Sequence, residues 1–372
     1  MQEDQHDSSR YLLRFTQQPT VDDSRTVILR EEASDVKHGF KPSERPIREY
    51  IKYGFIALDK PQGPTSHEAV AWLRKILSIE RAGHSGTLDP MVSGVLPVGL
   101  ESATKALSVL LLGPKEYVAL ARIHDSIPKE ILQSTIDMFA GQIYQKPPQR
   151  SSVKRVTRTR EIYSIETVQQ TGNLILLRVL CESGTYIRKL IYDLGEVLKV
   201  GATMVELRRT KVCDLTEDKL VRLHDVFEAK AVLGESSNER KLRQVIVPIE
   251  RAVSFLKQIT IRDSAIDSVC HGAQLALPGI LSFSSGVVKG EIVRIMSGKG
   301  ELVAIAESQM NEVELRSAEH GIASLTRRVV MGSGTYPRMW GKSAKDKETE
   351  DIGESLLKKS ILDSLEERDS EV

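Results

Sequence analysis

Apolar residues near the start of the main body follow first a strand-like run and then a helical spacing. Residues 55–58 form a short apolar run that ends in the Pro- and Gly-containing stretch 59–64, which predicts a strand entering a loop. Thr65 and Glu68 have the spacing of a capping box, and the apolar residues after them recur every three or four positions. We therefore expect a helix from this cap to about Ile79.

Strand and helix patterns continue beyond this point in irregular order. Residues 103–112 have a helical pattern, residues 174–180 are typical of a buried strand, and residues 186–198 place their apolar side chains on one helical face. Because these elements intermix without a regular strand–helix–strand alternation, we expect an α+β fold with a central mixed or largely antiparallel sheet.

The pattern changes character between about residues 235 and 258. Residues 234–240 are polar, and residues 259–330 contain short strands separated by glycine turns, which predicts a small β-barrel-like module. We therefore expect four parts, namely an N-terminal extension (1–50), a main domain (51–250), a small β-barrel domain (258–332) and a C-terminal segment with a charged tail (333–372).

Composition places the chain among globular proteins with a sizeable core. Its 372 residues exceed one ordinary domain, and 40% are hydrophobic and 28% charged. The sequence contains no apolar run long enough to cross a bilayer, and its acidic, polar start does not resemble a secretory signal. Cys181, Cys213 and Cys270 lie too far apart for a metal site. We expect each to be a small buried or partly buried side chain in a reducing compartment.

The net charge of +1 is an average over unlike parts of the chain. Residues 1–50 carry 8 Lys and Arg against 10 Asp and Glu, and residues 341–372 carry 6 against 10. Residues 51–340 carry 38 against 31, so the body is basic and both ends are acidic. The apolar residues within 352–365 fit either one amphipathic helix or a disordered tail.

Basic residues concentrate in one segment of the body. Residues 141–160 contain no acidic residue and six basic ones, namely Lys146, Arg150, Lys154, Arg155, Arg158 and Arg160. Such a segment is either a solvated face or a mobile loop that clamps phosphates.

Single residues in the glycine-rich segment carry little information by themselves. Asp89 precedes Pro90, as an ordinary turn or cap aspartate does. Gly83 and Gly86 match neither a phosphate-binding loop nor a dinucleotide fingerprint. His84 has no nearby cysteine or carboxylate to complete a metal site, so a structural role is the simpler interpretation.

Several segments taken together are more specific. The motifs stand in this order: 58–67 (LDKPQGPTSH), 83–90 (GHSGTLDP), 115–117 (KEY), 184–188 (GTYIR) and 206–210 (ELRRT). As a set they resemble the TruB/dyskerin family of pseudouridine synthases. Three further stretches, 41–46, 145–155 and 334–340, resemble the archaeal dyskerin branch, the catalytic subunit of box H/ACA guide ribonucleoproteins. Residues 271–280 resemble the opening of a PUA domain, the RNA-binding module of this family.

The resemblance implies an enzyme that isomerises uridine to pseudouridine in RNA, with Asp89 as catalytic aspartate. Asp89 would act as a nucleophile or as the base that removes a ribose proton, and the sequence does not choose between these routes. Arg188 would hold the carboxylate ionised and oriented, and Tyr117 would stack on the flipped uracil.

The remaining site residues follow from the same resemblance. Tyr186 would lie at the pocket, Leu207 would line it, Lys60 would shape its wall, and His84 would position the flipped nucleotide. The RNA contacts implied outside the pocket come from Lys146, Arg150, Lys154, Arg155 and, in the PUA module, Gly272. No step of the isomerisation requires a cofactor or a metal.

Partners implied by the resemblance are a box H/ACA guide RNA, rRNA and tRNA substrates, and small ribonucleoprotein subunits, with no membrane. The acidic tail favours an archaeal, cytoplasmic protein over a nucleolar eukaryotic one. Two alternatives stay open, namely a stand-alone tRNA TΨC-loop synthase and a non-catalytic RNA-binding scaffold. A generic hydrolase has no nucleophile elbow, metal set or Ser/His pair to support it.

Overall fold

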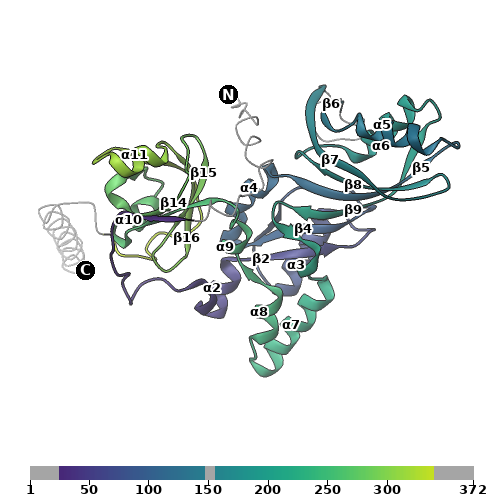
Figure 1. The fold of residues 1–372 in the computed structure, drawn as a ribbon. Helices are drawn as coiled ribbons and strands as arrows, with labels where there is room; N and C mark the ends of the chain where they lie inside the picture. Colours follow the sequence, from purple (N-terminus) through teal and green to yellow (C-terminus); the bar gives the residue numbers. More distant parts are fainter. Residues whose placement is uncertain (1–24, 147–155, 339–372) are drawn as a thin grey trace, which may run out of the picture.

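Two β-sheets organise the computed structural model, which describes residues 25–146 and 156–338 (Figure 1). The strands of the larger sheet are β2 (Gly54–Lys60), β3 (Ala82–His84), β4 (Val92–Leu100), β5 (Lys115–Ile123), β6 (Gly141–Gln145), β7 (Arg158–Thr171), β8 (Leu174–Cys181), β9 (Ala202–Val212), β10 (Leu215–Thr216) and β11 (Val247–Pro248). Its helices are α2 (Ile47–Lys52), α3 (Ser66–Leu77), α4 (Leu107–Leu112), α5 (Lys129–Asp137), α6 (Ile187–Val197), α7 (Leu223–Ser236), α8 (Arg240–Val245) and α9 (Ile249–Ala252), with 3-10 turns η1 (Pro42–Glu44), η2 (Glu101–Ala106) and η3 (Glu217–Lys219).

The smaller sheet contains the C-terminal strands and one strand from the N-terminal segment. Its elements are β1 (Thr26–Ile28), β12 (Lys257–Ile261), α10 (Asp263–Cys270), β13 (Leu275–Ala276), η4 (Leu277–Gly279), β14 (Ile280–Ser284), β15 (Ile292–Met296), β16 (Leu302–Ser308), α11 (Glu312–Ser317) and β17 (Ile322–Val329).

The strand order confirms the expected α+β class. The larger sheet runs β11-β2-β4-β9-β5-β8-β7-β6, with β3 beside β4 and β10 beside β9. The smaller, curled sheet runs β1-β14-β12-β15-β16-β17-β13. Antiparallel pairs predominate, and the parallel pairs β4–β9 and β12–β15 make both sheets mixed.

Helix α3 begins as the capping pattern predicts. The backbone N–H of Glu68 donates to Thr65 Oγ1 at 3.1 Å, and the Glu68 carboxylate accepts from the Thr65 N–H at 2.8 Å. The reciprocal bonds satisfy two N–H groups that a helix start leaves without intrahelical partners. The cap fixes where α3 starts. The apolar face of the helix is then buried through Ala69, Leu73 and Leu77.

Strands β4 and β9 approach so closely that only glycine fits between them. Gly94 has φ +105°, and a Cβ there would lie 2.1 Å from the backbone oxygen of Arg209. Any side chain would therefore push the strands apart. This contact brings the start of β4, which follows the Asp89 loop, against the middle of β9.

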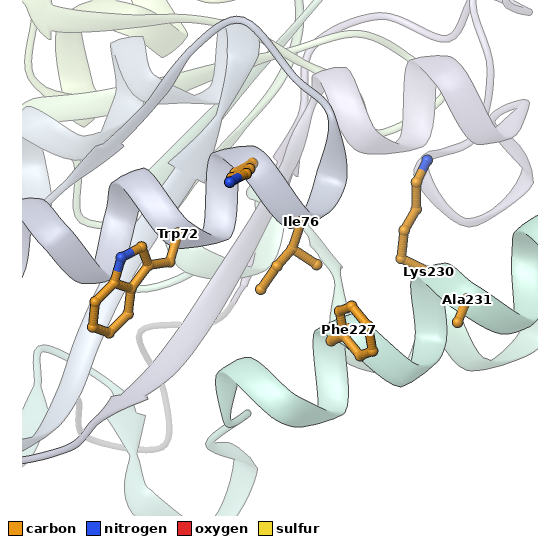
Figure 2. A pocket seen from close by; sticks show the side chains of 6 residues that line it. Trp72, Ile76, Phe227, Lys230 and Ala231 are labelled. Carbon is orange, nitrogen blue, oxygen red and sulfur yellow. The ribbon is translucent and has the colours of Figure 1, made fainter.

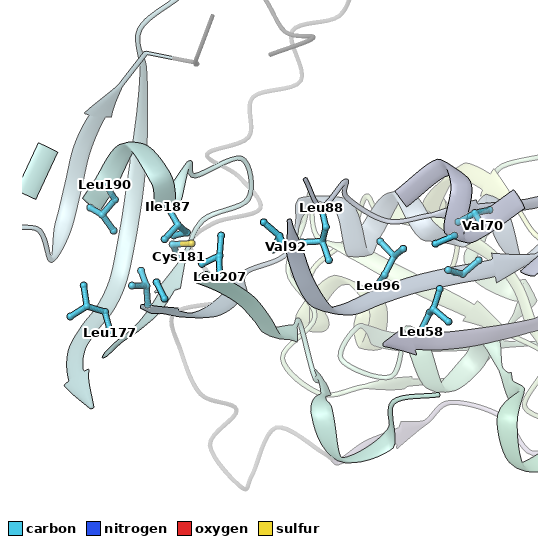
Figure 3. Close-up of a cluster of buried hydrophobic side chains, with 14 of the residues drawn as sticks. Leu58, Val70, Leu88, Val92, Leu96, Leu177, Cys181, Ile187, Leu190 and Leu207 are labelled. Atoms are coloured by element: carbon cyan, nitrogen blue, oxygen red, sulfur yellow. The ribbon is translucent and has the colours of Figure 1, made fainter. Parts of the chain in front are cut away.

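The main hydrophobic core continues beneath the Asp89 loop and beneath β9. Figure 3 shows Leu88 and Val92, on either side of Asp89 in sequence, in the same buried cluster as Cys181, Ile187 and Leu207. The core thus joins the glycine-rich segment to β8, and to α6 and β9, which carry the candidate residues Arg188 and Leu207.

The N-terminal segment packs on the smaller sheet, a contact that the sequence did not predict. Strand β1 pairs with β14, with Val27 opposite Phe283. Farther along, the buried Tyr336 hydroxyl donates to Glu301 Oε2 at 2.7 Å, and Glu301 Oε1 accepts from the Phe40 N–H at 2.9 Å. Tyr336 lies in the 334–340 stretch singled out from sequence, so that motif helps to hold the N-terminal segment in place.

A buried ion pair joins the two sheets. Arg45 donates to both carboxylate oxygens of Glu250, at 2.7 and 3.2 Å, and Glu250 also accepts from the Leu302 N–H at 2.9 Å. Around it an apolar cluster includes Tyr53 from the larger domain and Ile305 from the smaller one. The modules are therefore connected by packing as well as by the chain.

Two local predictions need revision. Residues 103–112 are helical but form two pieces, η2 and α4, and the predicted polar loop starts later because α7 runs through Ser236. The cysteines behave as expected, since Cys181 and Cys213 are buried, Cys270 is partly buried and all three are free. Met339, Trp340 and the tail helix considered for 352–365 lie outside the described residues.

Candidate active site

Asp89 and Arg188 form an exposed ion pair. Asp89 lies in the loop between β3 and β4, and Arg188 lies in the first turn of α6. Arg188 Nη2 donates to Asp89 Oδ2 at 2.7 Å, and the two side chains are 56% and 57% exposed. A guanidinium at this distance orients the carboxylate, and the exposure leaves both groups open to a large substrate.

The backbone on both sides of Asp89 is pinned from within the protein. Ser66 Oγ accepts from the Leu88 N–H at 2.9 Å and donates to the Leu88 carbonyl at 3.1 Å. The Gly63 N–H donates to the Pro90 carbonyl at 2.9 Å. Because both neighbours are held through backbone atoms, the Asp89 side chain is oriented without any direct contact to these residues.

Lys60 completes this support. Its fully buried ammonium donates to the carbonyls of Pro61, Pro90 and Val92 at 2.8, 3.2 and 2.9 Å. Burial lowers the pKa of Lys60, while the negative charge of Asp89 opposes that shift. Lys60 therefore holds the loop that carries Asp89, and its predicted role in shaping the site stays a prediction.

Arg209 is a second buried support that the sequence interpretation missed. It is 1% exposed, with Nε donating to the Val95 carbonyl at 2.8 Å and Nη2 to the Gly86 carbonyl at 3.1 Å. Burial lowers the pKa of Arg209. Arg209 thus links β9 to the chain before Asp89, at Gly86, and to the strand after it, at Val95. The available signal was its place in the 206–210 motif, where only Leu207 was assigned a role.

Tyr117 lies beside this arginine. It pairs with Arg209 across β5 and β9 and is half-buried. Burial raises the pKa of the Tyr117 phenol, an effect that Arg209 opposes and the nearby Asp89 charge reinforces. The phenol therefore stays protonated near neutral pH.

Tyr186 and Leu207 occupy different environments. Tyr186 is the N-cap residue of α6, two positions before Arg188, and its side chain makes no capping hydrogen bond. Leu207 is only 7% exposed and lies opposite Val92 in the parallel β4–β9 register. Tyr186 thus belongs to the turn that delivers Arg188, whereas Leu207 packs beneath the Asp89 loop.

His84 lies on β3 and packs edge-to-face against His67, with ring centroids 5.0 Å apart. Its Nδ1 is buried and has no hydrogen-bond partner within 25–146 and 156–338. Burial lowers the pKa of His84, and His67 and Arg209 act in the same direction. His84 is therefore neutral near pH 7.

The RNA-contact candidates are only partly described. Lys146 is exposed at the end of β6, and Gly272 lies at a turn with φ +88° and open space around it. Arg150, Lys154 and Arg155 fall outside the described residues. Arg160, from the same basic segment, turns inward and pairs with Glu182 at 3.1 Å.

An apolar groove lies on another part of the larger domain (Figure 2). Trp72, Lys75 and Ile76 line it from α3, and Phe227, Lys230 and Ala231 line it from α7. Its lining contains no carboxylate, so it is distinct from the Asp89 site. Within the described ranges no cluster of His, Cys, Asp and Glu could hold a metal ion. Of the helices in those ranges, none is both long and apolar enough to span a bilayer.

Family models match nearly the whole described chain. Residues 74–187 match the N-terminal domain of TruB family pseudouridylate synthases, and residues 188–254 match the C-terminal domain of tRNA pseudouridylate synthase B. Residues 257–330 match the PUA domain, and residues 20–70 match the DKCLD (NUC011) domain.

Individual relatives agree with these matches. A probable tRNA pseudouridine synthase B from Pyrobaculum arsenaticum is 47% identical over 87% of this chain and 97% of its own length. One from Methanocaldococcus jannaschii is 45% identical over 88% and 98%.

Solved structures extend the similarity to the fold. The archaeal box H/ACA Nop10–Cbf5 complex contains a chain 43% identical to this one, with a TM-score of 0.78 over 85% of this chain and 99% of that chain. An H/ACA ribonucleoprotein bound to a substrate RNA containing 2'-deoxyuridine gives 44% identity and a TM-score of 0.79 over 85% and 98%.

Proposed function

Since the chain belongs to the TruB family of pseudouridylate synthases, isomerases that act on RNA, we propose that Asp89 is its catalytic carboxylate. The observation that carries this proposal is the pairing of an exposed Asp89 with Arg188 on a loop whose backbone is pinned on both sides. A carboxylate held in this way is oriented before substrate arrives, which is the arrangement that catalysis requires.

The reaction breaks the bond between ribose and N1 of uracil, turns the base, and joins ribose to C5. The proton lost from C5 is balanced by the proton gained at N1, so the reaction consumes no second substrate. Asp89 starts this sequence either by attacking the ribose or by removing one of its protons, and both routes need the ionised form.

The reaction also requires that the target uracil be unstacked from its neighbours, and aromatic side chains suit the binding of such a base. A target uridine must leave its neighbours, which costs a few kcal/mol. We assign Tyr117, which pairs with Arg209 beneath the Asp89 segment, to stacking on the extruded uracil, with Tyr186 at the edge of the site. His84, neutral and partly buried, positions the nucleotide and transfers no proton in this scheme.

Asp89→Asn tests this assignment. We expect pseudouridine formation to disappear while RNA affinity stays within about twofold, since the amide keeps the size of the carboxylate but is neither a base nor a nucleophile. Asp125→Asn, at an exposed aspartate in another loop, serves as the control and should keep full activity. An active Asp89→Asn enzyme would refute the assignment.

We further propose that a guide RNA of the box H/ACA type selects the uridine and that small protein subunits complete the particle. Support comes from the similarity to chains found in H/ACA complexes with Nop10 and Gar1, and from the N-terminal segment that packs on the PUA module. Lys146 and Gly272 are the described residues that we assign to RNA contact, together with the basic segment that contains Arg150, Lys154 and Arg155.

The competing function is guide-free modification of tRNA, favoured by the names of the curated relatives. Purified protein should be assayed on one tRNA substrate with a matching guide, with a mismatched guide and with none. Guide-dependent selection predicts product with the matching guide alone. Product on tRNA without any guide, and none with the matching guide, would favour the competing function.

A further inference from the structure

The turn that delivers Arg188 is held by a residue from the neighbouring β-hairpin. Gln145, the last residue of β6, is 2% exposed. Its Oε1 accepts from the Tyr186 N–H at 2.9 Å, and its Nε2 donates to the Tyr186 carbonyl at 3.1 Å. One side chain thus binds both polar backbone atoms of the same residue.

Tyr186 sets where α6 begins, because it is the N-cap residue of that helix. The Tyr186 carbonyl also accepts the first helical hydrogen bond, from the Leu190 N–H at 3.0 Å. Gln145 therefore fixes the direction in which the first turn of α6 leaves the preceding loop.

A second contact from the same hairpin holds the residues just before Tyr186. Arg160 on β7 donates to Glu182 Oε1 at 3.1 Å, and the Glu161 N–H donates to Glu182 Oε2 at 3.1 Å. The β6–β7 hairpin thus binds the 182–186 turn at Glu182 and at Tyr186. Arg188 follows two residues after Tyr186.

We propose that Gln145 is a positioning residue for catalysis, which aims Arg188 at Asp89 by fixing the backbone of Tyr186. Arg188 is exposed and bound to Asp89 by a single guanidinium nitrogen, so its direction depends on the helix start. Small errors in the placement of such groups reduce rates strongly, by up to ~100-fold for about 1 Å.

This inference rests on the proposed role of Asp89. The experiment measures single-turnover pseudouridine formation at saturating RNA, together with the RNA dissociation constant, for the full chain. Gln145→Ala should lower the rate by ~10- to 100-fold and leave RNA affinity within about twofold. Gln142→Ala removes an exposed glutamine from the same strand and should match the wild type.

Gln145→Glu gives a readout that a purely structural role would not produce. In its protonated form the substituted side chain has one O–H donor and one acceptor, so it can make both bonds to Tyr186. The carboxylate form keeps only the acceptor and repels the Tyr186 carbonyl. The rate relative to wild type should therefore be nearly normal at about pH 5 and fall several-fold by about pH 8, because burial places the titration above the ordinary pKa of a glutamate side chain.

Asp89→Asn, assayed beside these variants, separates the positioning role of Gln145 from the catalytic role of Asp89. If it is inactive and the Gln145→Glu rate ratio is independent of pH, the positioning role is wrong while the catalytic assignment stands. If Gln145→Ala equals Gln142→Ala in rate, the positioning role is also wrong. If Gln145→Ala does not fold, the pH profile of Gln145→Glu decides. An active Asp89→Asn enzyme overturns the catalytic assignment itself.

Discussion

Two Arg–carboxylate pairs in this molecule have the same length and opposite surroundings. Arg188 and Asp89 meet at 2.7 Å with more than half of each side chain exposed. Arg45 and Glu250 also meet at 2.7 Å, but their side chains are only 3% and 9% exposed. One pair lies at the candidate active site and the other where the two sheets join.

The difference in burial separates their roles. An exposed pair adds little to stability, about 0–1 kcal/mol, because water competes for both charges. It can therefore be rearranged by a substrate at low cost. A buried pair cannot lose one partner without leaving an uncompensated charge, and Glu250 further anchors the backbone of Leu302. The same chemistry thus lies open to substrate at the proposed catalytic site and connects the domains at the other.

The largest effect on stability is expected at the buried pair. Glu250→Gln should lower the free energy of unfolding by ~3–5 kcal/mol, because Arg45 is left charged and buried. Chemical denaturation measures this loss. Glu44→Gln, at an exposed pair with Lys41, is the control and should cost less than about 1 kcal/mol. If Glu250→Gln cost as little as Glu44→Gln, Arg45 would have to find another partner.

At the exposed pair the effect should appear in the rate. Arg188→Gln should reduce single-turnover pseudouridine formation by ~10- to 100-fold, since the carboxylate loses its orienting cation. The free energy of unfolding should change by less than about 1 kcal/mol. Arg178→Gln breaks another exposed pair, with Glu166, and should leave both quantities nearly unchanged. If Arg188→Gln lowered the free energy of unfolding as much as Glu250→Gln does, burial would not separate the roles of the two pairs.

The smallest effect concerns pH. Burial lowers the pKa of His84 in the folded protein, so the unfolded chain takes up this proton first as pH falls. The contribution of neutral His84 to stability is therefore present above about pH 6.5 and is lost as pH falls further. His84→Asn should make unfolding less pH-dependent between about pH 7 and pH 5.

His320→Asn, at an exposed histidine, should leave the pH dependence of unfolding as in the wild type. Identical profiles for wild type and His84→Asn would show that His84 titrates normally in the fold.

Local patterns predicted the elements whose causes are local. The strand before Asp59, the capping box at Thr65 and the apolar face of α6 are all written in adjacent residues, and the structure confirms each. The order of the five motifs likewise pointed to Asp89 and Arg188, which the fold brings together although 99 positions separate them.

Supports that depend on distant partners were not visible in the sequence. Ser66 and Gln145 act through backbone atoms 22 and 41 positions away, and no local pattern records such contacts. Arg208 and Arg209 are adjacent on a strand, so they face opposite sides of the sheet. Only the fold shows that Arg209 is the buried one. Strand β1 was also missed, because three residues are too few to show a period.

The most direct test of this division measures rate and stability on the same preparation of Asp89→Asn. We predict that single-turnover pseudouridine formation falls by at least ~100-fold while the free energy of unfolding changes by less than about 1 kcal/mol. Asp89 would then be an exposed catalytic group held by a separately stable fold. Retained turnover, or a stability loss like that expected for Glu250→Gln, would contradict the account.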